Sequence, residues 1–261
     1  MSERMLYTVT DGIATITFNR PQVMNALDPE TIVAFRAVCE RAGNDPQARV
    51  VMLRGAGPAF LAGGDVASFR DNLPRIADSV IGLAGELHRG ILALRRAPKP
   101  VIACVHGAVA GAGMSIMMAC DLIIAAAGTQ FTMAYSRIAT SPDGGASWFL
   151  PRLVGYQKAM ELLLLADTVD AAALQAMGVI NRVVPAADLD GAALTLAQRL
   201  AAGPATAYAE TKALVNASSN QQLNEHLDAE AQAFARCAAH TDFAEGVNAF
   251  VEKRKAVFRG M

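Results

Sequence analysis

The sequence predicts an α/β protein in which short apolar strands alternate with helices, followed by a purely helical C-terminal region. Three observations support this class. Hydrophobic residues make up 53% of the 261 residues, enough to bury a large core in one domain. Strand-like and helix-like segments follow one another in turn up to residue 202. Gly203 and Pro204 then mark a boundary, so we expect a core over 1–202 and a helical region over 203–261.

The N-terminal segments predict a hairpin and a capped helix. Residues 6–9 and 13–18 alternate apolar and polar side chains around an Asp-Gly dipeptide, which is typical of β-hairpin turns. A helix is expected over 29–42, because Asp28 suits the N-cap and Pro29 suits the first helical position.

The remaining elements continue the alternation. Strands are predicted at 50–53, 101–105, 122–125 and 179–184, and helices at 86–96, from 112 onward, and at 157–166, 171–177, 189–201, 204–216, 223–239 and 243–254. Parallel strands with helices packed outside them are expected.

Residues 71–85, around an Asn-Leu-Pro sequence, are predicted to form a mobile loop. We expect that the helical region after residue 203 does not bury its apolar faces alone and packs on the core or on other subunits.

Composition excludes several classes of function. The formal charge is −1 and no basic run appears, which disfavours nucleic acid as a partner. The apolar stretch over 108–120 is too short to span a bilayer, and the N-terminus lacks a signal-peptide core, so no membrane partner is expected. The four cysteines lack zinc-ligand spacing, which predicts no metal site and fits a reducing, cytoplasmic location. Charged residues are only 18%, which suggests surface buried between subunits.

Two glycine-rich turns follow successive predicted strands, at 54–65 and 106–115. Small residues let a ligand approach the backbone, and the second turn also leaves free N–H groups at a helix start. Two such groups converging on one point would form an oxyanion hole. The alternative is that the glycines only permit tight helix–strand packing, and the residues alone leave both interpretations open. The simplest role of Asp65 is as the N-cap of a helical turn predicted over 66–70.

Asp143 is the only carboxylate between Asp121 and Glu161, within a Ser-Pro-Asp-Gly-Gly turn. It is either a turn-forming cap or a proton-transfer group facing an apolar cavity. Burial in such a cavity would raise its pKa above about 3.9 and make it a better base. His88 falls in a predicted helix among polar neighbours and is interpreted as a surface residue. Ser115 is interpreted as a buried structural serine, because Gly-Met-Ser lacks the second glycine of a nucleophile elbow.

Four motifs, in this order, resemble the signatures of the crotonase superfamily, the enoyl-CoA hydratases and isomerases. They are NRPQVMNAL at 19–27, AFLAGGD at 59–65, PVIACVHGAVAGAG at 100–113 and FVEKRK at 250–255. The resemblance covers nearly the whole chain. It implies a crotonase-like spiral of β-β-α units whose C-terminal helices form homotrimers, often paired as a dimer of trimers.

The resemblance implies an acyl-CoA thioester as the ligand, with its carbonyl between the N–H groups of Leu61 and Ala112. It implies no separate cofactor, because the CoA belongs to the substrate. Phe250 and Lys253 would reach the CoA of a neighbouring subunit. The positions that match the CoA contacts of the family within one chain are Asn25, Ala26, Leu27, Ala62, Gly63 and Asp65.

The departures from the superfamily pattern bear on the reaction. Hydratases of this superfamily carry two water-activating glutamates, whose matching positions here are Ser115 and Tyr135. Serine is too weak an acid to replace glutamate, and tyrosine has a pKa of about 10. Asp143 falls where isomerase-like and dehalogenase-like members keep a carboxylate, and 131–145 is especially similar to the phenylacetate-pathway isomerase branch. Dehalogenase-like members also use a histidine on an upstream helix, near His88, but carry tryptophan at position 135.

We therefore expect enoyl-CoA isomerisation, in which Asp143 moves a proton from C2 to C4 of a 3-enoyl-CoA. Ser115, Tyr135 and Trp148 would line the acyl pocket. Hydration of 2-enoyl-CoA is the alternative, with water held by other groups. A catalytically idle acyl-CoA binder is a third interpretation. A serine protease on the related spiral fold is disfavoured, because no usable Ser-His-Asp arrangement is present.

Overall fold

The computed structural model describes residues 3–70 and 73–260 of the chain. Within these residues the strands form a six-stranded sheet in the order β1-β2-β3-β4-β6-β9 and a three-stranded sheet in the order β5-β7-β8. The strands are β1 (Met5–Thr10), β2 (Ile13–Phe18), β3 (Val50–Gly55), β4 (Val101–Val105), β5 (Ala108–Ala110), β6 (Leu122–Ala126), β7 (Gln130–Thr132), β8 (Val169–Asp170) and β9 (Arg182–Val184).

The predicted hairpin and the predicted parallel strands are confirmed. β1 and β2 pair antiparallel, with Met5 opposite Phe18. From β2 onward every neighbour in the large sheet runs parallel, so the carboxyl ends of β3 and β4 lie at the same edge. The glycine-rich turns that leave these two strands are therefore brought together.

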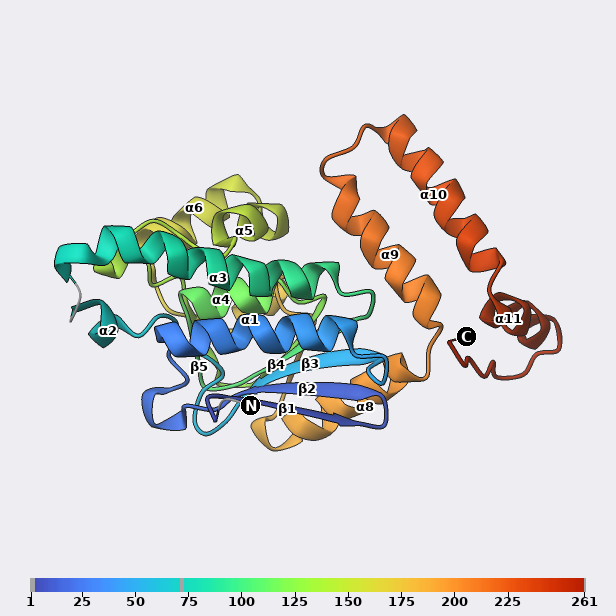
Figure 1. Cartoon of the computed structure of the whole chain (residues 1–261), viewed down its shortest axis with the longest axis horizontal. Helices are drawn as coiled ribbons and strands as arrows, with labels where there is room; N and C mark the ends of the chain where they lie inside the picture. The colour runs from blue at the N-terminus through green and yellow to red at the C-terminus, as the bar shows by residue number, and fades with distance from the viewer. Residues whose placement is uncertain (1–2, 71–72, 261) are drawn as a thin grey trace.

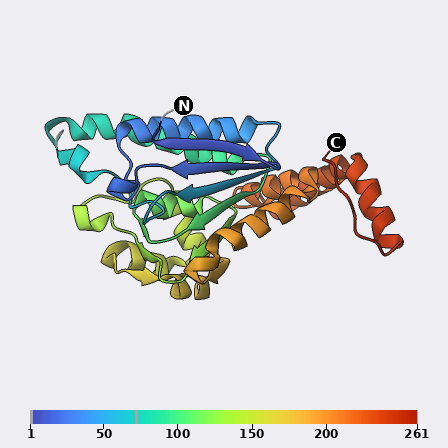
Figure 2. The ribbon, with the colours of Figure 1, turned by 90° about the horizontal axis from the view of Figure 1, so that it is seen from below.

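Helices cover both faces of the large sheet, as Figures 1 and 2 show. α1 and α3 pack against each other over one face, and α8 packs on the other through a cluster that includes Val50, Ile102 and Ala193. The helices are α1 (Pro29–Asn44), α2 (Val66–Arg70), α3 (Ile76–Arg96), α4 (Ala112–Met118), α5 (Ala146–Val154), α6 (Tyr156–Leu165), α7 (Ala171–Ala176), α8 (Leu189–Ala201), α9 (Ala205–Ser218), α10 (Leu223–Ala238) and α11 (Thr241–Val251), with short 3-10 turns η1 (Pro21–Val23), η2 (Leu73–Arg75), η3 (Ser136–Ile138) and η4 (Ala186–Asp188).

The predicted cap of α1 is confirmed, and the predicted loop over 71–85 is wrong. Asp28 Oδ1 accepts a hydrogen bond from the N–H of Thr31 at 2.8 Å. Residues 71 and 72 lie outside the described residues, but α3 begins at Ile76, ten residues before the expected start. Leu83 packs against the core one helical turn before the buried Leu87, so the apolar stripe of α3 extends back into 76–85 and outweighs the loop signal of the Asn-Leu-Pro sequence.

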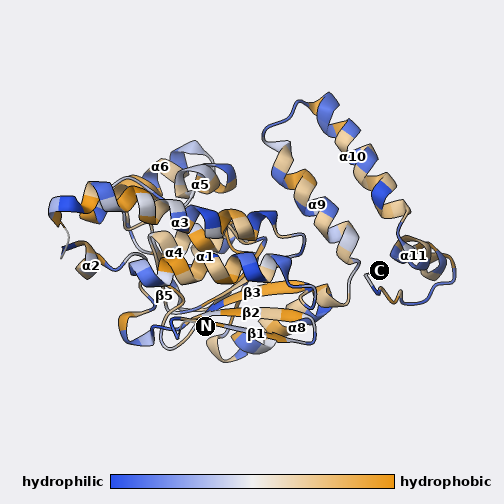
Figure 3. Cartoon of the chain, in the orientation of Figure 1, coloured by the Kyte–Doolittle hydropathy of each residue, from blue (hydrophilic) through white to orange (hydrophobic). Residues whose placement is uncertain are grey.

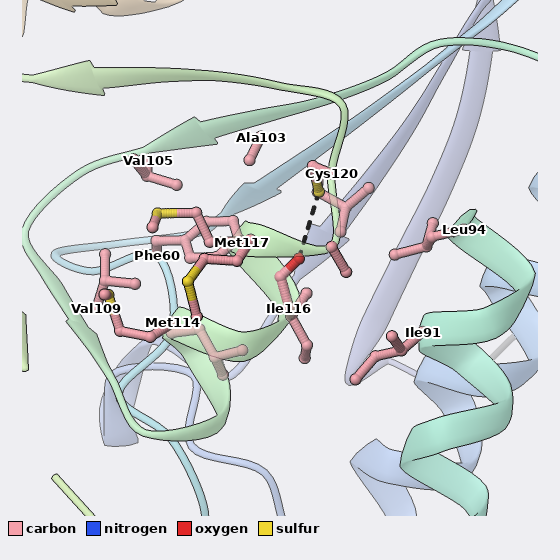
Figure 4. Packing of buried hydrophobic residues seen from close by; sticks show 14 of the residues in the cluster. Phe60, Ile91, Leu94, Ala103, Val105, Val109, Met114, Ile116, Met117 and Cys120 are labelled. Carbon is pink, nitrogen blue, oxygen red and sulfur yellow. Dashed lines mark hydrogen bonds between the residues drawn. The ribbon is translucent and has the colours of Figure 1, made fainter. Parts of the chain in front are cut away.

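A short buried helix, α4, stands at the centre of the core (Figure 4). Its residues Met114 and Met117 pack with Phe60, and Ile91 and Leu94 of α3 point toward it. Cys120 Sγ donates to the Ile116 carbonyl at 3.4 Å, and burial raises the pKa of Cys104 to about 11. Cys104 and Cys120 are therefore buried, free thiols.

α9, α10 and α11 extend away from the sheets (Figures 1 and 2). A partly buried lysine ties α9 to the core: Lys212 Nζ donates to the Leu94 carbonyl and pairs with Asp121, each at 2.8 Å. Apolar and polar residues alternate along α9 and α10 (Figure 3), and large apolar side chains on these helices are exposed in the single chain. Their burial by other subunits stays a prediction. In the described part of the chain, every helix is too short or too polar to cross a membrane.

Candidate active site

A cavity of about 350 Å³ opens where the two glycine-rich turns meet. Its walls are mostly apolar and come from α2, α3 and the η3 segment. Gly64 and Ala112 line it from the two turns, and Asp143 and Tyr135 line it from the opposite side. This arrangement places backbone N–H groups and one carboxylate around a space that fits a small-molecule ligand.

The two turns touch through their backbones. A Cβ atom on Gly63 would lie 2.9 Å from the Ala110 carbonyl oxygen, so only glycine permits this approach. Gly63 also has φ of +99°, in the left-handed region. The close approach brings the segment that follows β3 alongside the start of α4, as the oxyanion-hole interpretation requires.

Leu61 is not a free donor, which corrects the prediction made for it. Its N–H donates to the Ala108 carbonyl at 3.3 Å, and its side chain is fully buried. The cavity-facing donor on this turn is Gly64. The N–H of Leu27 donates to the Gly63 carbonyl, and the Leu27 carbonyl accepts from the N–H of Asp65. Because successive N–H groups of an extended segment point in opposite directions, the N–H of Gly64 points away from Leu27.

The N–H of Ala112 is the second cavity-facing donor. Ala112 is the first residue of α4, where N–H groups have no partner inside the helix. Among the hydrogen bonds of residues 3–70 and 73–260, none uses the N–H of Gly64 or of Ala112. Both groups line the cavity and remain available for an oxygen atom of a ligand.

Ser115 and Tyr135 hold the main chain at Asp143. The Ser115 hydroxyl lies 2.8 Å from the Asp143 carbonyl oxygen, and the Tyr135 hydroxyl lies 2.9 Å from it. The two hydroxyls are also 2.8 Å apart. Two protons can serve only two of these three contacts at once, so both hydroxyls are fully engaged. Ser115 is completely buried beneath the cavity wall instead of lining it, and Tyr135 lines it.

The pKa of Tyr135 is raised to about 12, with burial as the largest cause; the hydrogen bond with Ser115 lowers the pKa, and the charge of Asp143 raises it. Tyr135 is therefore a neutral phenol at physiological pH and cannot act as a general base. The prediction that neither position supplies acid–base chemistry is consistent with this environment.

The turn at Asp143 fits against Ser115 only because a glycine follows. Gly144 has φ of +62°, and a Cβ atom there would lie 2.9 Å from the Ser115 Cβ. α5 then begins after Gly145, which has no side chain to act as a cap. The Asp143 carboxylate is directed elsewhere, so the capping interpretation of this residue is wrong.

The partner of the Asp143 carboxylate is His88, a contact that the surface interpretation of His88 missed. His88 Nε2 lies 2.6 Å from Asp143 Oδ1, across a sequence separation of 55 residues. The side chains are 47% and 38% exposed, respectively, so the carboxylate borders both the cavity and solvent. Asp143 thus faces a mostly apolar cavity, as the proton-transfer interpretation requires, but its carboxylate is not shielded from solvent.

Trp148 does not belong to this cavity. Its ring packs edge-to-face on Phe149 at 5.0 Å, and the Arg152 guanidinium lies 4.0 Å from its centre. α5 turns this side chain toward a separate hollow of about 680 Å³ between the core and α9. The residues that line the cavity instead include Leu83 of α3 and Ile138 of η3.

The predicted CoA positions near the N-terminus divide into residues that line the cavity and residues that do not. The Asn25 side chain is structural. Its amide donates to the carbonyls of Ala56 and Ala59 at 2.9 and 2.7 Å, and it is 1% exposed. The carboxylate of Asp65 pairs with Arg20 at 3.3 Å. Leu27, Ala62 and Gly63 line the cavity directly, whereas Ala26 presents its carbonyl to Arg20.

Phe250 and Lys253 are remote from the cavity of their own chain. Phe250 lies on α11 and is 86% exposed, and Lys253 follows that helix in an exposed turn with φ of +55°. A contact with CoA would have to involve another subunit, as the resemblance implied, and it stays a prediction.

Comparison with known proteins agrees with this geometry. A family model for enoyl-CoA hydratase/isomerase matches residues 8–261. A probable enoyl-CoA hydratase of Rhodobacter capsulatus is 37% identical over 257 residues, covering 97% of each chain. The 1,2-epoxyphenylacetyl-CoA isomerase of Escherichia coli is 34% identical over 262 residues, covering 100% of each. The crystal structure of an enoyl-CoA hydratase from Polaromonas sp. JS666 has a TM-score of 0.93 at 36% identity, covering 98% of this chain and 99% of that one. The expected crotonase-like fold is thereby confirmed.

Proposed function

Since the chain belongs to the enoyl-CoA hydratase/isomerase family, whose members act on acyl-CoA thioesters, we propose that it is an isomerase. It converts a 3-enoyl-CoA into the conjugated 2-enoyl-CoA. The substrate brings its own CoA, and the proposal requires no other cofactor. The N–H groups of Gly64 and Ala112 bind the thioester oxygen, and Asp143 is the base.

The reaction needs one proton and one carboxylate. Asp143 takes the proton from C2, and the electron pair moves toward the thioester carbonyl, whose oxygen gains negative charge. The two N–H groups stabilise that charge, a contribution of about 2.7–4 kcal/mol for each donor in comparable sites. Asp143 then returns the proton to C4, which leaves the double bond between C2 and C3.

The observation that carries this proposal is the count of usable acid–base groups around the cavity. Asp143 is the one carboxylate among the described cavity-lining residues. Ser115 and Tyr135 hold its main chain and are not carboxylates. Hydration needs a second group that orients and deprotonates water, whereas a proton that leaves and returns on one face needs only one.

A substrate panel tests the proposal. Purified protein is assayed on linear 3-enoyl-CoA esters for appearance of the conjugated thioester absorption, and in parallel on crotonyl-CoA for its loss through hydration. We expect isomerisation to exceed hydration by at least about 100-fold, the scale of one missing acid–base group. The reverse ratio would identify a hydratase, and tight binding without turnover would identify an acyl-CoA binder. Adding the ring epoxide of phenylacetyl-CoA to the panel tests the activity named for the Escherichia coli relative.

The contact between His88 and Asp143 favours a second candidate, hydrolytic displacement. There Asp143 would attack a substrate carbon, the leaving group would depart as an anion, and His88 would deprotonate water to cleave the resulting ester. Tyr135 stands where dehalogenase-like members carry tryptophan. A halogenated aroyl-CoA in ¹⁸O-labelled water distinguishes the two: halide release with label in Asp143 supports displacement, and its absence leaves isomerisation.

We also propose that the functional unit is a trimer or a dimer of trimers, in which Phe250 and Lys253 contact the CoA of a neighbour. Phe250 and Val251 are 86% and 74% exposed at the end of α11. Light scattering measures the mass. Phe250→Ala and Lys253→Ala are expected to raise KM with little change in kcat, and an unaffected KM would remove this role.

A further inference from the structure

His88 sits on the solvent-facing side of the helix that walls the cavity. Leu83, Ala84 and Leu87 of α3 line the cavity, while His88 and Arg89 are exposed on the same turn of helix. The imidazole reaches Asp143 from outside the cavity. The carboxylate is therefore held between an imidazole on one side and the substrate space on the other.

The two oxygens of Asp143 have different environments. Oδ1 lies 2.6 Å from His88 Nε2, a charge-assisted hydrogen bond when Nε2 carries the proton. In the part of the chain that the structure describes, Oδ2 has no hydrogen-bond donor. Oδ2 is thus the oxygen left for the substrate. Because Nε2 already carries a proton in this arrangement, it cannot accept the one that Asp143 removes.

We propose that His88 is a positioning residue that fixes Asp143 in one orientation, so that the proton taken from C2 stays on Oδ2 until it returns to C4. The inference rests on the proposed isomerase function and deepens it. The carboxylate borders solvent as well as the cavity, but with Oδ1 held by His88 the carboxyl group is not free to rotate and carry the proton on Oδ2 away from the substrate. The same proton therefore travels from C2 to C4, and exchange with water is slow relative to transfer.

Label transfer measures this role directly. A 3-enoyl-CoA deuterated at C2 is converted in ordinary water, and the fraction of product carrying deuterium at C4 is determined by mass spectrometry. The wild type is expected to transfer most of the label. His88→Leu removes the donor, frees the carboxyl group to rotate, and is expected to lower the transferred fraction at least threefold.

Two variants separate positioning from general damage to the helix. His88→Gln keeps an N–H donor and is expected to restore most of the label transfer. Arg89→Gln changes the adjacent exposed residue, which pairs with Glu86 and not with Asp143, and is expected to match the wild type. Thermal unfolding confirms that each variant is folded, and leucine at position 88 retains high helix propensity.

The outcomes are distinguishable. If the wild type forms no conjugated product, the proposed function fails and the role of His88 fails with it. If the wild type is active and His88→Leu transfers the same fraction of label, only the role of His88 is overturned. A loss of label transfer in His88→Gln equal to that in His88→Leu would also overturn it.

Discussion

The Tyr135 hydroxyl lies 2.9 Å from the main-chain carbonyl oxygen of Asp143. Hydratases of the family carry a glutamate at the position of Tyr135. Here Tyr135 instead holds the turn that bears Asp143, the only cavity carboxylate in the described chain. In the proposed isomerase, this position supports a single base instead of activating water.

Removing that hydroxyl is expected to disturb catalysis more than folding. In Tyr135→Phe, Ser115 still donates to the Asp143 carbonyl, so the loss of unfolding free energy should be about 1 kcal/mol, typical of one hydrogen bond. Because Asp143 loses part of its support, kcat for isomerisation should fall severalfold while KM changes little. Denaturant titration and steady-state kinetics measure both, and an unchanged kcat would contradict this role.

A side chain added at Gly144 is expected to lower both the stability of the protein and its activity. In Gly144→Ala the new Cβ would lie 2.9 Å from the Ser115 Cβ, at a residue whose φ is +62°. Gly178→Ala is the matched control, with φ of +81° and open space around its Cβ position. Both carry the backbone penalty of about 1 kcal/mol. Only Gly144→Ala should lose more unfolding free energy than this and also lose activity. Equal losses of unfolding free energy in the two variants would show that the contact with Ser115 is unimportant.

Separating the two glycine-rich turns is expected to impair the oxyanion hole. In Gly63→Ala the new Cβ would lie 2.9 Å from the Ala110 carbonyl oxygen and push Gly64 away from Ala112. Loss of one donor should lower kcat by about 10²–10³. Kinetics on a 3-enoyl-CoA, with circular dichroism as the check on folding, provide the measurement. Full activity in a folded variant would exclude this pair of N–H groups.

The anchoring of the C-terminal segment is expected to weaken in acid. Hydrogen bonds from Arg254 and from the N–H of Val257 lower the pKa of Glu245 to about 2, below its ordinary value. A carboxyl whose pKa is lowered by folding stabilises the protein above its unfolded-state pKa, and the contribution disappears as pH falls through the folded-state value. Wild type and Glu245→Gln should therefore differ in melting temperature at pH 6 and converge near pH 2. A difference that persists at pH 2 would refute the assignment.

Local sequence signals were sufficient for the elements that depend on neighbours along the chain. The cap at Asp28, the first hairpin and the parallel strands all follow from capping, turn and periodicity rules. The start of α3 was missed, because a Leu-Pro sequence suggested a loop while the apolar stripe that forms the helix is only evident against the core.

The site required tertiary information at three points. Whether the N–H of Leu61 is free depends on its pairing with Ala108, a segment far along the chain. The direction of Trp148 depends on how α5 rotates against α9. His88 meets Asp143 only because α3 packs across the turn before α5, and neither residue has a local signal for the other.

The rate of Asp143→Asn on a 3-enoyl-CoA tests the central claim most directly. Asparagine matches the shape of aspartate but cannot accept the proton from C2. Loss of a general base typically lowers kcat by about 10²–10⁴. We predict a decrease in this range, with substrate binding retained and the melting temperature within a few degrees of the wild type. Turnover equal to that of the wild type would contradict the assignment of Asp143 as the base.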